Sequence, residues 1–252
     1  MKFTKLIIIT QIDPFYTLSF LKELFYLIKN DKKLKSMNIK IFNLPNFNES
    51  KFSNFKRFFN LYGFFDTFKL VSKYFIAVYF LKQIKVFKKY CKLNNIEFIS
   101  ATNIEDIFID SKVDNLNKCV LSLSSPQIFK KNILSLKNIK FLNIHCAPLP
   151  SYKGMMPNFW QTFNEEYSSG ISLHEIDERI DTGKVISSFN YPLIRTTSLH
   201  NKMIMAKLYS AHIFYNYLNN IEGLQKIKIK NKYYRFPTKQ DGLIFKTKNK
   251  FI

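Results

Sequence analysis

The sequence of 252 residues is poor in glycine and lacks a glycine-rich phosphate loop. It contains only six glycines and eight prolines, which excludes a collagen-like or low-complexity chain. No GxGxxG pattern occurs, and the first apolar run is followed by Gln11-Ile12-Asp13-Pro14 instead of glycines. The usual backbone cradle for a dinucleotide or a triphosphate is therefore missing.

Cysteines are few, and long hydrophobic runs are absent. Cys91, Cys119 and Cys146 are odd in number, and their spacing fits neither a disulfide framework nor a zinc site. The apolar run Leu6 to Ile9 is too short for a secretory signal. The longest uncharged apolar stretch, Tyr74 to Leu81, is far shorter than a membrane span. We expect a cytoplasmic protein.

Acidic residues are also scarce, with 18 Asp and Glu against 39 Lys and Arg and a net charge of +21. This excess suggests an anionic partner: nucleic acid, a membrane surface or a phosphorylated substrate. Only four of the basic residues are arginine, the side chain that reads phosphates and bases through a bidentate fork. Lys, Asn, Ile and Phe are enriched together, as an AT-rich genome would produce, so a basic surface without a dedicated partner is the alternative.

Hydrophobic residues make up 46% of the chain, enough for a sizeable core. A strand at Lys5 to Thr10, a helix at 15–30 and a strand at Asn38 to Phe42 predict a parallel α/β sheet. The same rhythm predicts further strands at Ile96–Ser100, Cys119–Ser124, Lys140–His145, Gly170–Ile176 and Lys184–Tyr191. It predicts further helices at Gln127–Leu136, Met156–Glu165 and Ser198–Asn220, with Ser198 as the cap of the last one.

We therefore predict a Rossmann-like α/β fold with an open, mostly parallel sheet and helices on both faces. Residues 1–195 would form one domain with a helical insertion at 44–90, and 196–252 would add a helix and a basic, irregular tail packed on it. The insertion is dense in Phe and Lys at helical spacing. Its aromatic face could pack on the sheet, or the stretch could lie on a membrane surface.

The stretch FLNIHCAPLPSYKGMMPNFW, residues 141–160, carries the first chemical signal. Side chains alternate along a strand, so Asn143 and His145 share one face at its carboxyl end, where open α/β sheets bind ligands. An amide can donate to a carbonyl oxygen that becomes anionic, and an imidazole can move a proton. The pair is a candidate acyl-transfer centre.

A second stretch, ISLHEIDERIDTGKVI at 171–186, reads as two strands joined by a polar loop that holds Asp181. Spacing alone does not show that Asp181 meets His145. His174, on the first of these strands, reads as a packed histidine, and His200 and His212 lack metal-ligand spacing.

Several separated blocks resemble the formyltransferases that use 10-formyltetrahydrofolate. The signature is Asn-x-His, then Leu-Pro-x-Tyr-Lys/Arg-Gly, then Asp-x-Gly after a Gly-x-(Thr/Ser) strand. This chain matches it in order and spacing, with 36 residues between the histidine and the aspartate, at Asn143, His145, Leu149–Gly154, Gly170–Ser172 and Asp181–Gly183. The resemblance covers about 118–190 and is weak over 1–117.

The resemblance implies a role for each matched position and no metal. Asn143 would hold the formyl oxygen, His145 would stabilise the tetrahedral intermediate and move its proton, and Asp181 would orient or charge-pair His145. The folate pocket would be lined by Ser124, Ser125, Gln127, Glu178 and Ile180. The amine substrate would be bordered by Lys153, Met155, Met156 and Pro157.

The resemblance leaves the amine acceptor open. We expect residues 192–252 to be too few for the RNA-binding barrel of methionyl-tRNA formyltransferases, and Thr10-Gln11-Ile12-Asp13 replaces the phosphate loop of glycinamide ribonucleotide formyltransferases. A nucleotide-linked amino sugar for surface glycans, such as a lipopolysaccharide O-antigen, is the expected acceptor. Nucleic acid is not an expected partner, whereas peripheral membrane contact and a homodimer stay open. A non-catalytic protein that binds folate or an anion is a further alternative.

Overall fold

The computed structural model describes residues 3–45, 50–108, 117–221, 223 and 231–252. Seven strands form one sheet in the order β3-β2-β1-β4-β5-β7-β8. The first five are parallel, whereas β7 runs antiparallel to β5 and to β8. Their bounds are β1 (Lys5–Thr10), β2 (Asn38–Asn43), β3 (Glu97–Ser100), β4 (Lys118–Leu123), β5 (Ile139–His145), β7 (Ser168–Glu175) and β8 (Val185–Pro192). The predicted mostly parallel α/β sheet is confirmed.

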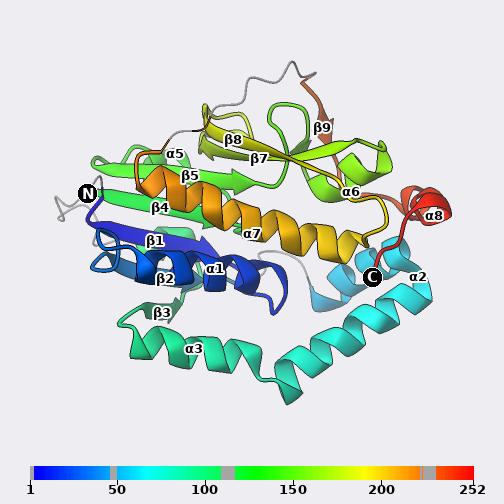
Figure 1. Ribbon diagram of the computed structural model, residues 1–252, viewed down its shortest axis with the longest axis horizontal. Helices are drawn as coiled ribbons and strands as arrows, with labels where there is room; N and C mark the ends of the chain where they lie inside the picture. Colours follow the sequence, from blue (N-terminus) through cyan, green and yellow to red (C-terminus); the bar gives the residue numbers. More distant parts are fainter. Residues whose placement is uncertain (1–2, 46–49, 109–116, 222, 224–230) are drawn as a thin grey trace.

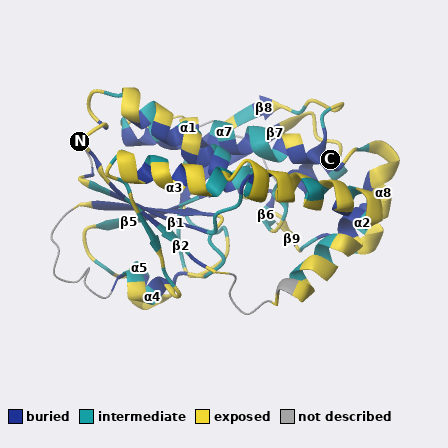
Figure 2. Ribbon diagram, turned by 90° about the horizontal axis from the view of Figure 1, so that it is seen from below, coloured by how far each residue is buried: buried dark blue, intermediate teal, exposed yellow. Residues whose placement is uncertain are grey.

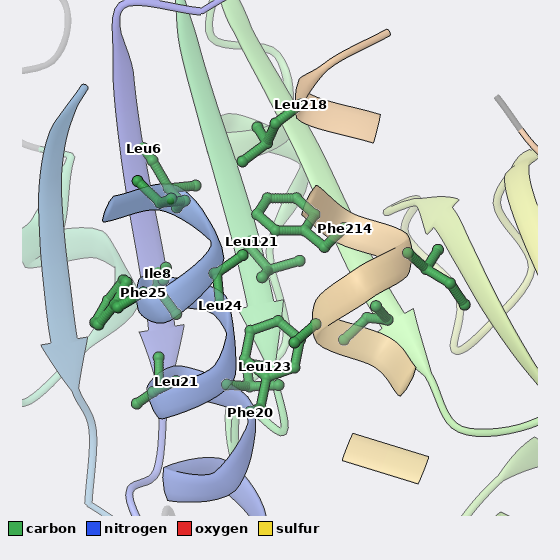
Figure 3. Close-up of a cluster of buried hydrophobic side chains, with 14 of the residues drawn as sticks. Leu6, Ile8, Phe20, Leu21, Leu24, Phe25, Leu121, Leu123, Phe214 and Leu218 are labelled. Atoms are coloured by element: carbon green, nitrogen blue, oxygen red, sulfur yellow. The ribbon is translucent and has the colours of Figure 1, made fainter. Parts of the chain in front are cut away.

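Helices cover both faces of this sheet because its central strands are apolar on both sides. Leu6 and Ile8 of β1 pack under α1 (Tyr16–Asn30) and α7 (Leu199–Leu218), which lie side by side on one face (Figures 1 and 3). Ile7 and Ile9 point to the other face, toward the short helices α4 (Ile104–Ile107) and α5 (Lys131–Leu134). Alternation along single strands thus builds two cores, one on each face.

The insertion is helical, as expected, but most of its aromatic side chains do not pack on the sheet. It comprises α2 (Lys51–Phe75), the π-helix η1 (Ile76–Phe80) and α3 (Gln83–Leu93). Phe87 of α3 stacks on Phe25 of α1, and Tyr74 near the end of α2 lies edge-on to Phe15, the residue just before α1. The Phe65 and Phe68 side chains of α2 remain 76% and 65% exposed. The packing interpretation is therefore wrong for α2 and η1. Residues 46–49 of the expected insertion lie outside the described residues.

The tail is not irregular throughout, contrary to expectation. It contains α8 (Lys239–Lys248), which begins with a capping box between Thr238 and Asp241. Phe245 of α8 and Phe251 are buried in a third apolar cluster, together with Leu61 of α2 and Phe159 of α6 (Pro157–Phe163). A two-stranded sheet pairs β6 (Lys153–Gly154) with β9 (Tyr233–Tyr234). Residues 222 and 224–230 of the tail lie outside the described residues.

Most predicted boundaries agree with the structure to within two residues, with one clear exception. The helix predicted at Gln127–Leu136 is reduced to α5, because residues 124–130 form an extended loop beyond β4. Within the described residues, no helix combines the length and apolar character needed to cross a bilayer.

Candidate functional site

Asn143 and His145 lie at the carboxyl end of β5, in the middle of the sheet. Phe141 belongs to the apolar cluster on the α4 and α5 face, whereas Leu142 and Ile144 belong to the opposite cluster. Alternation therefore places Asn143 and His145 on the same face as Phe141. His145 is buried and Asn143 is partly buried.

The hydrogen bonds of His145 define its tautomer. Its Nε2 lies 2.6 Å from the backbone oxygen of Tyr152. A carbonyl oxygen can only accept, so Nε2 carries the proton and, in the neutral ring, Nδ1 keeps its lone pair. Nδ1 lies 3.6 Å from Oδ2 of Asp181. Burial is the largest influence and lowers the pKa of His145, although the Asp181 carboxylate opposes it. The ring is therefore a neutral base at neutral pH.

Asp181 reaches the histidine from the loop between β7 and β8. Its backbone has a positive φ of 54°, and its Oδ2 accepts a 2.8 Å hydrogen bond from the Gly154 N–H. Burial acts to raise the pKa of Asp181, but the side chains of His174 and His145 and the Gly154 N–H lower it overall. A carboxylate thus faces a neutral imidazole.

Glycine is required where this loop closes. A Cβ at Gly183 would lie 1.8 Å from the backbone oxygen of Glu175, at the end of β7. Any side chain at that position would force the loop away from β7 and so displace Asp181 from the site. The Asp-Thr-Gly pattern therefore has a steric reason.

His174 joins the site, although the sequence suggested only a packed histidine. It is the cross-strand partner of Asn143, and its Nδ1–H donates to the backbone oxygen of Glu175 at 2.8 Å. Its Nε2 therefore accepts from Nδ2 of Asn143 at 3.0 Å, and it lies 3.6 Å from Oδ1 of Asp181. No described residue takes the second N–H of Asn143. The antiparallel pairing of β5 and β7, which brings these two residues together, is not visible in the sequence.

The residues expected around the folate occupy two neighbouring loops. The loop after β4 holds Ser124 and Ser125, and the β7–β8 loop holds Glu178 and Ile180. Glu178 lies 4.0 Å from Lys131 at the start of α5, the helix that follows the first loop, so the two loops are neighbours. The Ile180 side chain is half exposed beside Asp181.

The side chains of the first loop are partly engaged within the protein. The Ser125 hydroxyl bonds to the backbone oxygen of Gln127. The Gln127 amide donates to the backbone oxygen of Thr102 and accepts from the N–H of Ile104, at 2.8 and 3.0 Å. Gln127 therefore connects its loop to the segment between β3 and α4.

Lys207 is a site residue that the sequence analysis missed. This buried lysine of α7 donates from Nζ to the Ser124 hydroxyl at 2.8 Å, and its charge contributes to the lowered pKa of His145. Its signal in the sequence was a lysine at helical spacing from the small buried residues Ser210 and Ala211. That signal marks burial but not the target of the side chain.

The residues expected to border the amine lie on both sides of Gly154. Lys153 is in β6, and Met155 is 42% exposed. Met156 has a positive φ of 52° and packs against the third cluster, while Pro157 begins α6, where proline is favoured. Among the described residues, no three His, Cys, Asp or Glu side chains are arranged to hold a metal ion.

Comparison with known proteins connects this site to one family. Residues 89–210 match the family described as formyl transferase. Over 120 residues the chain is 27% identical to methionyl-tRNA formyltransferase of Flavobacterium johnsoniae, a match that covers 46% of this chain and 38% of that protein. The chain therefore spans well under half the length of this relative.

Solved structures share the fold at low identity. An N-formyltransferase from Helicobacter canadensis, in complex with folinic acid and dTDP-3-aminofucose, is 19% identical with a TM-score of 0.52, covering 92% of this chain and 71% of that one. A phosphoribosylglycinamide formyltransferase from Anaplasma phagocytophilum is 12% identical with a TM-score of 0.55, covering 92% and 98%. At these identities the likeness establishes the fold and leaves the substrate open.

Proposed function

Since residues 89–210 belong to the formyl transferase family, we propose that this protein transfers a formyl group from 10-formyltetrahydrofolate to a primary amine. The observation that carries the proposal is the grouping of Asn143, His145 and Asp181 at the carboxyl end of β5. It combines an amide N–H that no described residue accepts, a neutral imidazole on the same strand and a carboxylate that the Gly154 N–H holds in place.

Each of the three side chains has one task in this reaction. The unused N–H of Asn143 donates to the formyl oxygen, which gains negative charge as the amine attacks. The unprotonated Nδ1 of His145 accepts the proton that the attacking amine releases and passes it to the leaving folate nitrogen. The Asp181 carboxylate stabilises the imidazolium during this transfer. When bound, the folate supplies the formyl carbon as the electrophile.

We propose that the two neighbouring loops hold the flat, partly apolar folate ring. Ile128 and Ile180 expose 65% and 50% of their side chains on these loops, although both are aliphatic. Burial of such side chains under a ligand is favourable. The exposed aliphatic side chains support Ser124, Ser125, Glu178 and Ile180 as lining residues, whereas Gln127 would act by holding its loop.

We also propose that residues 1–195 form the catalytic domain and that 196–252 complete it. Lys207 of α7 lies within the second part yet bonds Ser124 in the first. α7 packs along α1, so the two parts share one core.

We propose a nucleotide-linked amino sugar for surface glycans as the acceptor. Glycinamide ribonucleotide would need a binding site for its phosphate. The start of α1, where such a site is expected, is already occupied by a protein carboxylate. Asp13 accepts from the N–H groups of Phe15, Tyr16 and Thr17 at 2.6 to 3.0 Å. A phosphate would have to displace this charge from the helix N-terminus, where anions usually bind. The sugar N-formyltransferase with a matching fold binds dTDP-3-aminofucose.

The test is an assay of the purified chain with 10-formyltetrahydrofolate and a panel of acceptors, read by product mass. The panel contains amino-sugar nucleotides, glycinamide ribonucleotide and methionyl-tRNA. Methionyl-tRNA is included because the relative from Flavobacterium johnsoniae is named as a methionyl-tRNA formyltransferase. We expect formylation of an amino-sugar nucleotide. Formylation of methionyl-tRNA alone would replace the acceptor but keep the reaction, and no formylated product from any amine would refute the function.

A matched pair of histidine variants separates chemistry from folding. His145→Ala should lower turnover by orders of magnitude without lowering the melting temperature. His212→Ala removes a half-exposed histidine of α7 that pairs with Glu23 of α1, and it should keep wild-type turnover. Equal turnover of the His145 variant and the wild type would exclude the proposed mechanism.

A further inference from the structure

The segment 64–93, which we call the arm, forms one edge of the molecule. It contains the part of α2 after the kink at Gly63, then η1 and α3. Figure 1 shows the arm along the lower side of the molecule, and Figure 2 shows exposed residues along most of its length. Twelve of its large apolar side chains are exposed: Phe64, Phe65, Phe68, Val71, Tyr74, Phe75, Ile76, Tyr79, Phe80, Leu81, Val86 and Leu93.

The most apolar part of the arm is the corner between α2 and α3. The run Tyr74 to Leu81 carries no charge, and it is flanked directly by Lys73 and Lys82. Within it only Ala77 is buried, whereas Phe80 is 73% exposed. This corner is the lowest point of the molecule in Figure 1. An uncharged, aromatic corner that contacts little of its own protein is unusual for a surface that faces only water.

The rest of the arm is strongly basic. It contains seven lysines, no arginine and a single acidic residue, Asp66. The Asp66 carboxylate is already paired within the protein, at 2.9 Å from Nζ of Lys246 and 4.0 Å from Nζ of Lys69. A negatively charged partner would therefore meet almost uncompensated positive charge.

We propose that the arm docks this protein on an anionic lipid surface. The aromatic corner would enter the boundary between headgroups and acyl chains, while the lysines bind the acidic headgroups. A second copy docked through the same face would bring seven lysines against seven lysines, which like-charge repulsion opposes. Nucleic acid would leave the uncharged corner without a role. The proposal does not depend on the identity of the transferred group.

The test uses the purified full chain and vesicle flotation. Vesicles of equal parts phosphatidylglycerol and phosphatidylcholine should bind the chain at low salt, and vesicles of phosphatidylcholine alone should bind it at least about tenfold more weakly. High salt should weaken the binding to anionic vesicles, because it screens exposed charges. Equal binding to the two vesicle types, or no binding to either, would overturn the proposal.

Two variants with matched controls test the two halves of the surface. Replacing Lys85, Lys89 and Lys92 by glutamine should weaken binding about 100-fold, since each lysine near an anionic surface contributes roughly fivefold. The control replaces the exposed residues Lys32, Lys33 and Lys35 by glutamine, an identical change in net charge outside the arm. The double variant Ile76→Ser with Phe80→Ser should weaken binding about tenfold. Its control is Ile194→Ser with Ile221→Ser, two side chains 50% and 57% exposed elsewhere.

Each result decides for or against the arm. Loss of binding in the arm variants, with unchanged melting temperature and little loss in the controls, supports the proposal. Equal losses in the controls would show attraction by net charge alone and would overturn it. A dimer in sedimentation velocity that disappears with Ile76→Ser and Phe80→Ser, without vesicle binding, would assign the corner to contacts between copies. RNA binding that survives those two substitutions, again without vesicle binding, would assign the basic surface to nucleic acid.

Discussion

At the scale of single residues, the orientation of Asn143 depends on its neighbour across the sheet. His174 donates from Nδ1 to a backbone oxygen, so its Nε2 can only accept, and it does so from Asn143. This hydrogen bond requires the Asn143 amide nitrogen, and not its oxygen, to face His174. The second N–H of the amide is then available to another acceptor. In the proposed reaction, the histidine would therefore act by positioning the amide.

Replacing Asn143 by alanine should lower kcat by roughly 10²–10³, the usual effect of losing one oxyanion donor. His174→Ala should have a smaller effect of about tenfold, because the donor remains but loses its support. Steady-state kinetics with melting curves measures both. A larger loss in the His174 variant than in the Asn143 variant would show that the histidine itself contacts the reacting atoms.

The pH dependence of the reaction follows from the lowered pKa of His145. Its imidazole must be neutral to accept a proton, and its pKa lies below the ordinary value of about 6.5 because of burial. The base therefore remains active as the pH falls below that value, and activity disappears only when the pH passes through the lower, folded-state pKa. The acid limb of kcat/KM should lie below about 6.5.

The variant Asp181→Asn provides the check on this pH assignment. Removing the carboxylate removes the influence that raises the pKa of His145, so the acid limb should move to still lower pH while the rate falls. A pH–rate profile of the variant and the wild type measures this shift. An acid limb that moves to higher pH in the variant would show that another group is the base.

At the level of residues, the sequence predicts which side chains lie at the end of a strand better than it predicts contacts between distant elements. Asn143 and His145 follow from the alternation of one strand, whose apolar neighbours define its faces. Lys207 and His174 reach the site through packing between elements far apart in the sequence. Such contacts depend on the relative placement of whole elements, which a single periodic pattern does not encode.

At the scale of elements, α2 and α8 hold each other in place. Leu61 and Tyr62 of α2 are buried with Phe245 of α8 and with Phe251. The close approach requires Gly242 in α8, since a Cβ there would lie 2.3 Å from the backbone oxygen of Leu61. A backbone oxygen cannot rotate away as a side chain can.

The variant Gly242→Ala should therefore destabilise the protein, although alanine is normally favoured over glycine in a helix. Overpacking typically costs about 1–3 kcal/mol, which corresponds to a few degrees of melting temperature for a chain of this size. Thermal unfolding followed by circular dichroism measures it. Gly223→Ala is the control, because its nearest neighbour would lie 3.9 Å from the added Cβ. A stabilised Gly242 variant would mean that α8 moves freely against α2.

The contact between α2 and α8 explains why the helix in the tail could not be predicted from the sequence. α8 is a short helix with exposed Leu243 and Ile244 and only Phe245 buried among its large apolar side chains, so it has no clear apolar stripe. It is stabilised by its capping box and by α2, some 180 residues earlier in the chain. By contrast, α1 has a continuous apolar face toward the sheet, and its predicted position is confirmed.

At the scale of the whole molecule, the net charge of +21 opposes the compact state. Several lysines are paired with carboxylates, such as Lys40 with Glu97 at 2.6 Å and Lys130 with Glu105 at 2.7 Å. With 18 acidic residues against 39 basic ones, most positive charges have no acidic partner in the sequence. Folding brings these charges closer together, so mutual repulsion should be stronger in the folded state than in the unfolded chain.

Salt should therefore stabilise this protein by screening that repulsion. The screening length falls to about 10 Å at 0.1 M ionic strength, which weakens repulsion between lysines across the surface more than it weakens close ion pairs. We expect the melting temperature to rise with sodium chloride and with potassium chloride alike at equal ionic strength. The variant with Lys32, Lys33 and Lys35 replaced by glutamine carries less charge, so it should melt higher at low salt and gain less from added salt. A melting temperature that is constant or falls with salt would show that close ion pairs outweigh the excess charge.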